Sequence, residues 1–521
     1  MKNRNRTRMQ RRLLPIGIQN LSKIRSDHCY YVDKTRYACQ LVEQGGYFFL
    51  SRPRRFGKSL FLDTLKELFE CNQALFTGLY AERHWDWSTP SPVIRISLGS
   101  GVVRSRAELD SVLEEHLRDN ARRLGVTLSH TTISGRFAEL IEHTAHTHGA
   151  RAVVLIDEYD KPILDNLSDP ERAIEAREGL KNLYSVLKDA DPFLRFVLLT
   201  GVSKFSKVSL FSGLNNLNDI TLDPRYSAIC GYTDADVDTV FEPELDGLDR
   251  DEIRRWYNGY NWGGDAVYNP FDLLLLFQKR VFKPYWFETA TPSFLVRLLA
   301  ERGCFTPELN MLPSEEDLLG RFDVNDISTE ALLFQTGYLT IARVEQPITG
   351  HWIYTLGYPN LEVETSLNRA LLPVLGVPNG PRLRLTLLKV LQSADLALLE
   401  EHLKALFASI PHDWHRKNAI AHYEGYYASV FYSHFAALGV DVVVEDASSQ
   451  GRVDMRVSHG EHVYLFEFKV VADAPEGKAL QQIVDRGYAD KHRAAGRQVH
   501  LIGVEFSAAR RQIVAFETRA G

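Results

Sequence analysis

Cysteine is scarce in this chain of 521 residues, and its spacing does not suit metal or disulfide chemistry. There are five cysteines, and none forms a C-x-x-C pair. Cysteine ligands of structural zinc sites come in such close pairs, and disulfide frameworks belong to small cysteine-rich secreted chains. We therefore expect reduced thiols, with neither a zinc ribbon nor a disulfide framework. The cysteines are Cys29, Cys39, Cys71, Cys230 and Cys304.

Long apolar runs are also missing. A helix needs about 20 apolar residues to span a bilayer, and the leucine-rich run PFDLLLLFQKR is far shorter. Nothing at the start of the chain resembles the apolar segment of a secretory signal. With 45% hydrophobic and 25% charged residues, the composition is typical of a globular protein. We expect no membrane partner and a cytoplasmic location.

A strong net charge is absent as well, because the formal value of -6 gives no general attraction to nucleic acid. The charge is unevenly distributed, since MKNRNRTRMQRR at residues 1–12 has six basic residues and no acidic one. Two interpretations stay open. The segment is a disordered solubilising arm, or it is a tail that contacts the phosphates of DNA or RNA with salt-dependent affinity.

The length predicts two to four domains. Changes in the pattern of apolar residues along the chain suggest where their boundaries lie. Apolar runs without alternation, such as RAVVLIDEYD and LRFVLLTGVSK, suit strands buried on both faces of a parallel sheet. We therefore predict a doubly wound α/β domain at 13–223, after the basic arm at 1–12. A mainly helical lid or connector follows at 224–400. The last unit, 401–521, has the predicted order α-β-β-β-α-β.

A phosphate-binding motif occurs in an unusual form where the chain reads RPRRFGKS. The general pattern is G-x-x-x-x-G-K-[ST]. Gly57, Lys58 and Ser59 supply its ending, but Arg52 stands where the pattern has its first glycine. An apolar run precedes the motif and a helical pattern follows it, so a helix N-terminus would face a bound phosphate. A basic helix start on an exposed surface is the alternative.

A second feature, independent of the first, favours a nucleotide site. Asp157 and Glu158 end the apolar run VVLIDE, at the edge where open parallel sheets bind ligands. The aspartate suits the shell of a Mg²⁺ ion, and the glutamate suits the orientation or deprotonation of an attacking water. The next apolar run ends in Thr200 and Ser203. In related ATPases such a strand end senses the γ-phosphate, while a capped turn is the alternative for Thr200.

Another group of charged residues lies near the C-terminus, in two runs that read as paired strands. GRVDMRVS and VYLFEFKVV place Asp454 and Glu467 13 residues apart, which is the length of a hairpin. Residues i and i+2 of a strand share a face, so Glu467 and Lys469 point the same way while Phe468 packs into the core. Acids on neighbouring strands beside a lysine can bind Mg²⁺ and position a water for attack on a phosphodiester.

Two flanking helical segments extend this group. Glu424 lies in HYEGYYASVFY before the strands, and Gln482 lies in ALQQIVDRGY after the lysine. We expect Glu424 to face the same end of the sheet as the strand acids. For the tripeptide EFK alone, an exposed strand with alternating charge is the alternative.

Several motifs taken together resemble the AAA-ATPase-like family, a prokaryotic group of P-loop proteins often fused to a nuclease-like C-terminal domain. They are GIQ, YVDKT, FFLSRPRRFGKSL, IDEYDKP, WYNGY, YNPFDLL, FQTGYLTI and LGYPNLEV. The resemblance covers almost the whole chain after residue 13. In that family RPRRFGKS is the usual loop, which implies that Arg52 is not a defect.

The C-terminal group resembles the PD-(D/E)XK nuclease superfamily, in the branch fused to these ATPase-like domains. Together the two resemblances imply a P-loop NTPase sheet, a helical middle segment and a C-terminal PD-(D/E)XK-like α/β domain. The implied nucleotide-binding residues are Arg54, Arg55, Phe56, Gly57, Lys58, Ser59, Leu60, Asp157 and Thr200. The implied catalytic residues are Glu158, Glu424, Asp454, Glu467, Lys469 and Gln482. The implied metal ligands are Ser59, Asp157, Asp454 and Glu467.

The predicted function is ATP binding and hydrolysis, coupled to Mg²⁺-dependent cleavage of DNA or RNA, a pairing that suits genome defence. Nucleotide state would change the packing of residues 223–410 and so gate the nuclease. A different class of function is a signalling or scaffold ATPase whose C-terminal domain binds nucleic acid without cleaving it. A third keeps the nucleotide as a structural ligand only. The choice of DNA or RNA, homo-oligomerisation, an arginine finger and the biological trigger stay open.

Overall fold

The computed structural model places the chain in two compact units. The first unit comprises Met1–Ala290 and Met311–Asn360, and the second comprises Thr291–Asn310 and Leu361–Gly521. The boundaries predicted at 12, 223 and 400 stay a prediction. The residues described are 11–167, 169–204, 210, 214, 216–290, 295–296, 298–299, 302, 306–315, 319, 322–323, 326–377, 380–410, 424–448, 451–510 and 512–521.

Two sequence predictions bear on what these described ranges contain. Within them, no helix is both long enough and apolar enough to cross a membrane. Most of the basic arm at 1–12 falls outside them, so the two interpretations of that segment stay as they were.

The first unit is built on a parallel sheet with the strand order β2-β3-β4-β1-β5. Every residue of β3 is buried, which explains the apolar run without alternation. The order places β4 between β1 and β3. The predicted doubly wound α/β fold is confirmed. The strands are β1 Gly46–Ser51, β2 Val93–Ser97, β3 Ala152–Asp157, β4 Leu194–Gly201 and β5 Leu217–Asp219.

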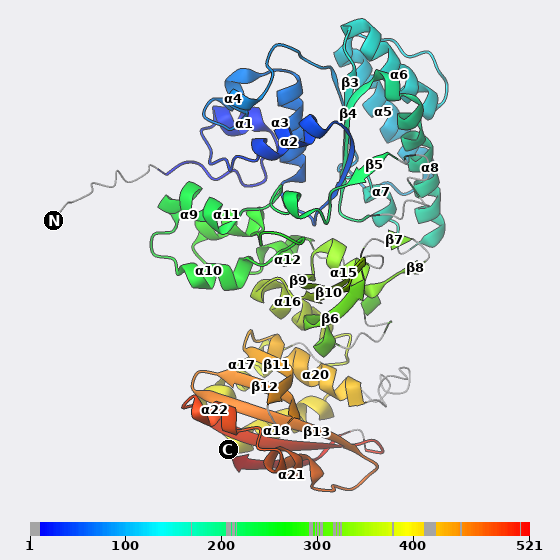
Figure 1. Ribbon diagram of the computed structural model, residues 1–521. Helices are drawn as coiled ribbons and strands as arrows, with labels where there is room; N and C mark the ends of the chain where they lie inside the picture. Colours follow the sequence, from blue (N-terminus) through cyan, green and yellow to red (C-terminus); the bar gives the residue numbers. More distant parts are fainter. Residues whose placement is uncertain are drawn as a thin grey trace, which may run out of the picture. The chain divides into compact units, whose positions relative to one another are not determined.

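Helices cover both faces of this sheet, with α3 on one side and α5, α6 and α8 on the other (Figure 1). The inner face of α5 consists of Leu109, Leu113 and Leu117, which recur every four residues and are buried. Side-chain caps begin α1, α5, α6 and α8, as Ser105 does for α5. The helices are α1 Leu21–Ser26, α2 Thr35–Gln44, α3 Lys58–Phe69, α4 Ala81–His84, α5 Arg106–Leu124, α6 Ile133–His148, α7 Lys161–Leu164 and α8 Pro170–Asp189.

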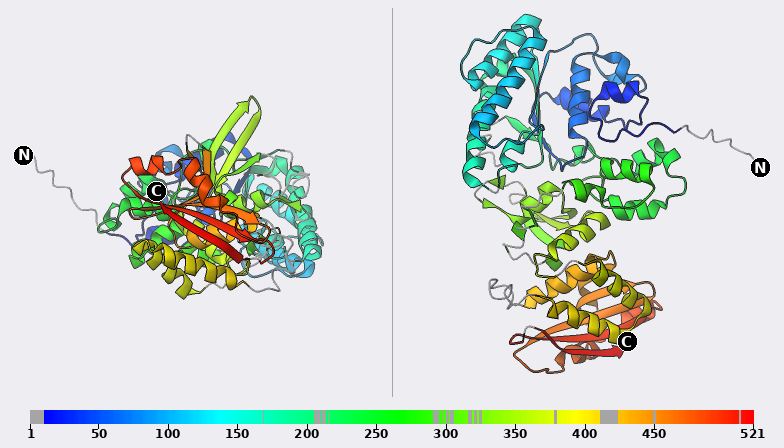
Figure 2. Two further views of the ribbon diagram at one scale, coloured as in Figure 1. Left: turned by 90° about the horizontal axis from the view of Figure 1, so that it is seen from below. Right: turned by 180° about the vertical axis from the view of Figure 1, so that it is seen from behind.

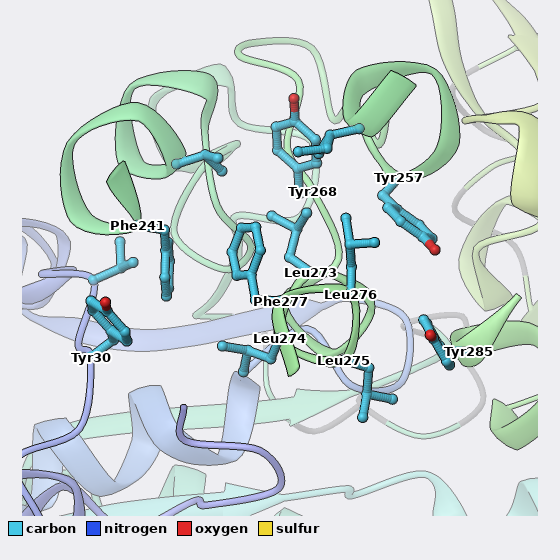
Figure 3. Close-up of a cluster of buried hydrophobic side chains, with 13 residues drawn as sticks. Tyr30, Phe241, Tyr257, Tyr268, Leu273, Leu274, Leu275, Leu276, Phe277 and Tyr285 are labelled. Carbon is cyan, nitrogen blue, oxygen red and sulfur yellow. The ribbon is translucent and has the colours of Figure 1, made fainter. Parts of the chain in front are cut away.

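A second core of the first unit joins the N-terminal segment to the helices that follow the sheet (Figure 3). The ring centroid of Tyr30 lies 5.1 Å from that of Phe241, which lies 5.3 Å from that of Phe277. The N-terminal segment is therefore packed between the sheet and the helical region. The helices of this region are α9 Asp234–Val240, α10 Arg250–Tyr257, α11 Pro270–Lys279, α12 Tyr285–Ala290 and α15 Thr329–Thr336.

The hairpin predicted in the middle of the chain is present in the first unit. Strands β9 Thr340–Ile348 and β10 His351–Gly357 pair antiparallel and, with β6 Leu312–Glu315, form a sheet of order β6-β10-β9. The hairpin extends beyond the neighbouring elements of its unit (Figure 2), and the last seven residues of β9 are exposed.

The second unit is built on a mixed sheet of order β11-β12-β13-β14-β15. Only β13 and β14 pair in parallel. The predicted order α-β-β-β-α-β is confirmed, and a short helix, α22, and a final strand, β15, are added to it. The elements are α16 Leu361–Leu371, α17 Pro381–Ser393, α18 Leu396–Ala408, α20 Glu424–Ala436, β11 Asp441–Ser448, β12 Gly451–His459, β13 His462–Val471, α21 Lys478–Asp485, α22 Asp490–Ala494, β14 Gln498–Ser507 and β15 Gln512–Ala520.

The two faces of β13 meet different helices. Phe466 and Phe468 contact Phe431 of α20 in edge-on and tilted ring pairs, whereas Leu465 packs with Ile483 of α21. Since side chains alternate along a strand, Glu467 and Lys469 lie on the α21 side of the sheet. The α21 side of the sheet thus carries both an apolar cluster around Leu465 and the polar side chains of Glu467 and Lys469.

A buried histidine pair joins α18 to α20. The Nε2 atoms of His402 and His434 lie 2.9 Å apart, and both side chains are buried. The Nδ1 atom of His434 has no hydrogen-bond partner in the described parts of the chain. Burial, and then the neighbouring His402, lower the pKa of His434 to about 3, and burial also lowers the pKa of His402. Both rings are therefore neutral in the folded protein near neutral pH.

This pair predicts a loss of stability in mild acid. The folded-state pKa values lie below the ordinary histidine value of about 6.5, so protons bind the unfolded chain in preference. The contribution of the pair to the free energy of unfolding should be constant above that value. Below it, this contribution should fall by at most about 1.4 kcal/mol per pH unit for each histidine. Urea unfolding between pH 8 and 5 measures the slope.

Matched variants isolate the contribution of the pair. His434→Gln should flatten the slope, whereas His146→Gln, which changes an exposed histidine of the first unit, should leave it unchanged. Equal slopes in the wild type and His434→Gln would contradict the assignment.

Candidate active sites

The segment between β1 and α3 forms a loop of the phosphate-binding kind. It ends at Gly57, whose φ is +93°, and α3 begins at Lys58. The ammonium group of Lys58 donates hydrogen bonds to the carbonyl oxygens of Arg52 and Pro53, at 2.8 and 2.9 Å. Lys58 is 6% exposed, and burial lowers its pKa. The lysine is thus folded back onto the loop that it closes.

Arg52, the residue that departs from the general motif, is a buried structural cation. Its guanidinium donates hydrogen bonds to the carbonyl oxygens of Ser51, Thr221 and Tyr226, at 2.8, 3.0 and 2.9 Å. The guanidinium carbon lies 4.1 Å from the ring centre of Trp262, a cation–π contact. Burial lowers the pKa of Arg52 to about 10, so it stays charged at neutral pH. The arginine fastens the start of the loop to the segment that follows β5.

The rest of the loop is held by residues from the same region of the first unit. The indole Nε1 of Trp286 donates a hydrogen bond to the carbonyl oxygen of Arg54 at 3.1 Å. At Gly337, where φ is +90°, a Cβ atom would lie 2.7 Å from Cγ of Pro53, so only glycine fits there. Residues 52–54 are therefore each held by a different residue between 221 and 337.

Acidic side chains lie at the edge of the sheet that this loop adjoins. Asp157, the last residue of β3, is buried and accepts a hydrogen bond from Oγ1 of Thr200 at 2.8 Å. Glu158 follows with φ at +51°, a conformation that is uncommon outside glycine and concentrates at functional sites. Burial raises the pKa of Glu158, and the charge of Lys58 opposes that rise. The structure brings these four residues together.

Ser203, the second polar residue at the end of this strand, has a structural role. Its backbone N–H and its hydroxyl both donate to Oδ2 of Asp160, at 2.6 and 2.5 Å. Asp160 is 1% exposed, and burial raises its pKa. Asp160 therefore stabilises the turn after β4. Of the two polar residues at this strand end, Thr200 bonds to Asp157 and Ser203 bonds to Asp160.

A cavity of about 390 Å³ opens over the loop, a volume that suits a small-molecule ligand. Its polar lining includes Arg54, Lys58, Ser59 and Glu158. Its apolar lining comes from several other segments, and the motifs were not assigned to it. The signal was present in the motifs GIQ and YVDKT, which contain two of its residues. The apolar lining includes Ile18, Tyr31, Tyr232, Phe271 and Leu274.

Part of the apolar lining is joined to α3, the helix that follows the loop, through Asp63. The carboxylate of Asp63 accepts a hydrogen bond from the backbone N–H of Leu21 at 2.7 Å and forms an ion pair with Arg95 at 2.7 Å. Asp63 is 2% exposed, so this contact is shielded from solvent. The segment that contains Ile18 therefore keeps its place relative to the first turn of α3.

Ser59 in the cavity lining and Asp157 at the end of β3 fit a magnesium ion that is bound together with phosphates. Proteins hold Mg²⁺ at such sites through one or two oxygen ligands, with phosphates and waters completing the shell. The hydroxyl of Ser59, in the cavity lining, and the carboxylate of Asp157 are ligands of this kind. Across the described ranges, no group of three or more His, Cys, Asp or Glu side chains could hold a metal by itself.

In the second unit, Asp454 of β12 and Glu467 of β13 lie side by side. β12 and β13 pair antiparallel from Met455 and Phe466 onward. The carboxylate of Asp454 accepts a hydrogen bond from the backbone N–H of Phe468 at 2.7 Å. The predicted hairpin therefore brings the two acids together. Lys469 Nζ lies 3.5 Å from Oε1 of Glu467.

The pKa of Glu467 is strongly shifted from its ordinary value. Its side chain is fully buried, and burial, followed by the charge of Asp454, raises its pKa to about 7. Oε1 accepts a hydrogen bond from the carboxamide of Gln482. Oε2 has no hydrogen-bond partner within the part of the chain that the structure describes. A buried carboxylate oxygen without a donor, beside a second carboxylate, is a fitting ligand for a divalent cation.

Glu424 cannot be placed in this site. It is the first residue of α20, and its side chain lies outside the described residues. The structure therefore brings together Asp454, Glu467, Lys469 and Gln482, and the position of the Glu424 carboxylate stays a prediction.

Comparison with known proteins matches each unit of the chain to a family. Residues 15–211 match a family described as a predicted AAA-ATPase, and residues 422–516 match the PD-(D/E)XK nuclease superfamily. The chain is also similar to a protein of Azotobacter chroococcum mcd 1 named "Uncharacterized protein in vnfD 5'region". The two are 61% identical over 511 residues, which make up 98% of this chain and 99% of the relative. The resemblance inferred from the motifs is confirmed.

The contacts of Arg52 predict a large effect of restoring the glycine of the general motif. Arg52→Gly removes a buried cation and leaves the carbonyl oxygens of Thr221 and Tyr226 without their donor. The free energy of unfolding should fall by roughly 2–5 kcal/mol. Urea unfolding followed by tryptophan fluorescence measures this loss.

Arg55→Gly is the matched control, because it removes an equal charge from the same loop. Arg55 is exposed and has a φ of +66°, which glycine adopts without strain. Its guanidinium carbon lies 4.1 Å from the ring centre of Phe271, so the free energy of unfolding should fall by no more than about 1 kcal/mol. A stability of Arg52→Gly equal to that of the control would show that the buried contacts contribute nothing.

Proposed function

Because the chain belongs to the predicted AAA-ATPase family and carries a C-terminal domain of the PD-(D/E)XK nuclease superfamily, we propose that it hydrolyses ATP and cleaves nucleic acid. The ATPase half is supported by the convergence of Lys58 and Glu158 on one open cavity. The nuclease half is supported by the buried Oε2 of Glu467, which has no hydrogen-bond partner among the described residues and lies beside Asp454 and Lys469.

In the ATPase half, the loop binds the phosphates and the strand ends carry the chemistry. Lys58 turns from the loop carbonyls to the β- and γ-phosphate oxygens, and the N–H groups at the start of α3 contact the phosphates. Ser59 and Asp157 hold Mg²⁺, which neutralises phosphate charge when bound. Glu158 orients the attacking water and accepts its proton, a role that its raised pKa favours.

Neighbouring residues complete this half. Thr200 keeps the Asp157 carboxylate in place through their hydrogen bond. Arg54, Arg55, Phe56 and Leu60 are also part of the cavity lining. The apolar lining, with Tyr31 and Tyr232, accommodates the base of the nucleotide.

In the nuclease half, Asp454 and Glu467 hold a divalent cation. When bound, such a cation polarises the phosphate and lowers the pKa of a coordinated water. Lys469 offsets the negative charge that develops on the phosphodiester during attack. Gln482 fixes the orientation of the Glu467 carboxylate through its hydrogen bond. Glu424 is assigned to the same site on its motif position alone.

The ATPase proposal predicts different defects for two substitutions. Lys58→Ala should abolish the thermal stabilisation of the protein by Mg-ATP, because the main contact to the phosphates is lost. Glu158→Gln should keep that stabilisation and lower the rate of phosphate release by about 10²–10⁴-fold. Thermal unfolding with and without nucleotide and a phosphate-release assay measure both.

Lys66→Ala is the control for this test, since Lys66 lies on the same helix, is paired with Glu67 and Glu70, and does not line the cavity. It should behave like the wild type. Undiminished stabilisation of Lys58→Ala by Mg-ATP would refute the site. Stabilisation by ATP without any turnover in the wild type would favour a nucleotide that serves only as a structural ligand.

The nuclease proposal predicts that plasmid DNA or RNA is cut in the presence of Mg²⁺ or Mn²⁺. Glu467→Gln and Lys469→Ala should each lower the cleavage rate by about 10²-fold or more, because each removes a group that acts on the metal or the phosphate. Gel electrophoresis of timed digests measures the rate.

Glu461→Gln and Lys478→Ala are the matched controls, since both change exposed residues of the same unit. They should cut like the wild type. Tight binding of nucleic acid without cleavage by the wild type would instead support a C-terminal domain that only binds, as in the scaffold alternative.

A further inference from the structure

Glu505 is a second buried acid of the C-terminal sheet, and the proposed chemistry does not use it. It lies on β14 and is 1% exposed. In the parallel pairing of β13 with β14, Glu505 is the partner of Lys469, and Gly503 is the partner of Glu467. A buried carboxylate is costly unless hydrogen bonds compensate for the loss of water. Its donors therefore indicate its role.

The donors of Glu505 are the first backbone N–H groups of α21. The N–H of Glu476 donates to Oε2 at 2.6 Å, and the N–H of Lys478 donates to Oε1 at 2.8 Å. Burial would raise the pKa of Glu505, but these bonds, with those from Gly477 and Ala479, outweigh burial and lower it. The carboxylate is thus held in its charged form.

This contact supplies what the helix lacks in its own sequence. The first N–H groups of a helix have no partner within the helix, and its N-terminus favours negative charge. The N-cap residue of α21 is Gly477, and no side chain caps the helix locally. Glu505, about 30 residues further along the chain, satisfies these groups from the neighbouring strand.

Gly503 sets how closely the same helix approaches the sheet. A Cβ atom at this position would lie 2.2 Å from the backbone nitrogen of Leu480 and 2.7 Å from its Cα. The first turn of α21 therefore rests on the backbone of β14, where any side chain would push it away. Glu505 and Gly503 together fix the start of the helix.

Gln482 lies about one turn beyond this anchor, and its position follows from that of the helix. From there its carboxamide reaches Oε1 of Glu467, on the strand next to β14. Ile483, the following residue, is fully buried and prevents the helix from rotating freely. The contact between Gln482 and Glu467 therefore depends on where α21 begins.

We propose that Glu505 is a positioning residue of the nuclease site, which acts through α21 and Gln482 on Glu467. By holding the helix start, it keeps Gln482 on one oxygen of Glu467 and directs the other toward the divalent cation. The inference rests on the proposed nuclease function and adds a residue that touches neither metal nor nucleic acid.

The test is the affinity of the full-length protein for Mn²⁺ without nucleotide, measured by calorimetry. Glu505→Gln keeps the size of the side chain but removes the charge that the helix start requires. The affinity should fall by about 10-fold, since residues that orient metal ligands contribute on this scale. Glu476→Gln, which removes an exposed charge at the same helix start, should leave the affinity unchanged.

Two further measurements separate positioning from general stability. In a Gln482→Ala background, Glu505→Gln should have no additional effect on Mn²⁺ affinity, because the hydrogen bond from Gln482 to Glu467 is already lost. Hydrogen exchange of the peptide that contains the start of α21 should be faster in Glu505→Gln than in the wild type. If Glu505→Gln alone is too unstable at higher temperatures, the Mn²⁺ affinity of Gln482→Ala tests the contact between Gln482 and Glu467 instead.

The outcomes distinguish this inference from the proposed function. Wild-type affinity for Mn²⁺ in Glu505→Gln, or unchanged exchange at the start of α21, would overturn the positioning role while the nuclease proposal stands. An equal loss of affinity with and without Gln482 would also overturn it. A wild-type protein that neither binds Mn²⁺ nor cleaves nucleic acid would contradict the nuclease proposal itself.

Discussion

A charge that is removed from water must be matched by dipoles or opposite charges, and this constraint shapes both units. Three carbonyl oxygens match the guanidinium of Arg52, and backbone N–H groups match Glu505. These groups hold the fold in place. Glu467 is matched on one oxygen only, and the excess charge is left at the position of a proposed cation site. Arg52 and Glu505 are thus each held by several hydrogen bonds to the backbone, whereas one oxygen of Glu467 has no hydrogen-bond donor among the described residues and can take a ligand.

The sequence was sufficient for the parallel sheet and for the residues that meet at its edge. The strand that ends in Asp157 is buried on both faces, so its apolar run has no alternation, and that pattern predicts its place. Strand ends of a parallel sheet lie at one edge, which is why Asp157 and Thr200 come together as predicted. In the same way, the spacing of Asp454 and Glu467 predicted a hairpin, and the period of the strand predicted their common face with Lys469.

What the sequence could not predict depends on partners far apart in the chain. The motif shows that Arg52 stands in the place of a glycine, but not that it donates hydrogen bonds to Thr221 and Tyr226, about 170 residues away. The apolar lining of the cavity combines residues 18 and 31 with residues 232–274, and no local sequence pattern connects these segments. Glu505 carried a signal, an acid within the apolar run LIGVEFS, but only the structure shows that it meets the start of a helix.

The arginine-anchored loop has an energetic consequence for the proposed ATP site. Arg52 and Trp286 already hold the loop backbone, so phosphate binding has less conformational entropy to remove than in a loose glycine loop. Lys58 must leave the carbonyl oxygens of Arg52 and Pro53, but bonds to phosphate are charge-assisted and stronger than those to neutral carbonyls. When Lys58 leaves these carbonyl oxygens, the surroundings of Arg52 and Pro53 change, and these two residues contact Trp262 and Gly337. Any response to ATP elsewhere in the first unit would therefore begin at these contacts.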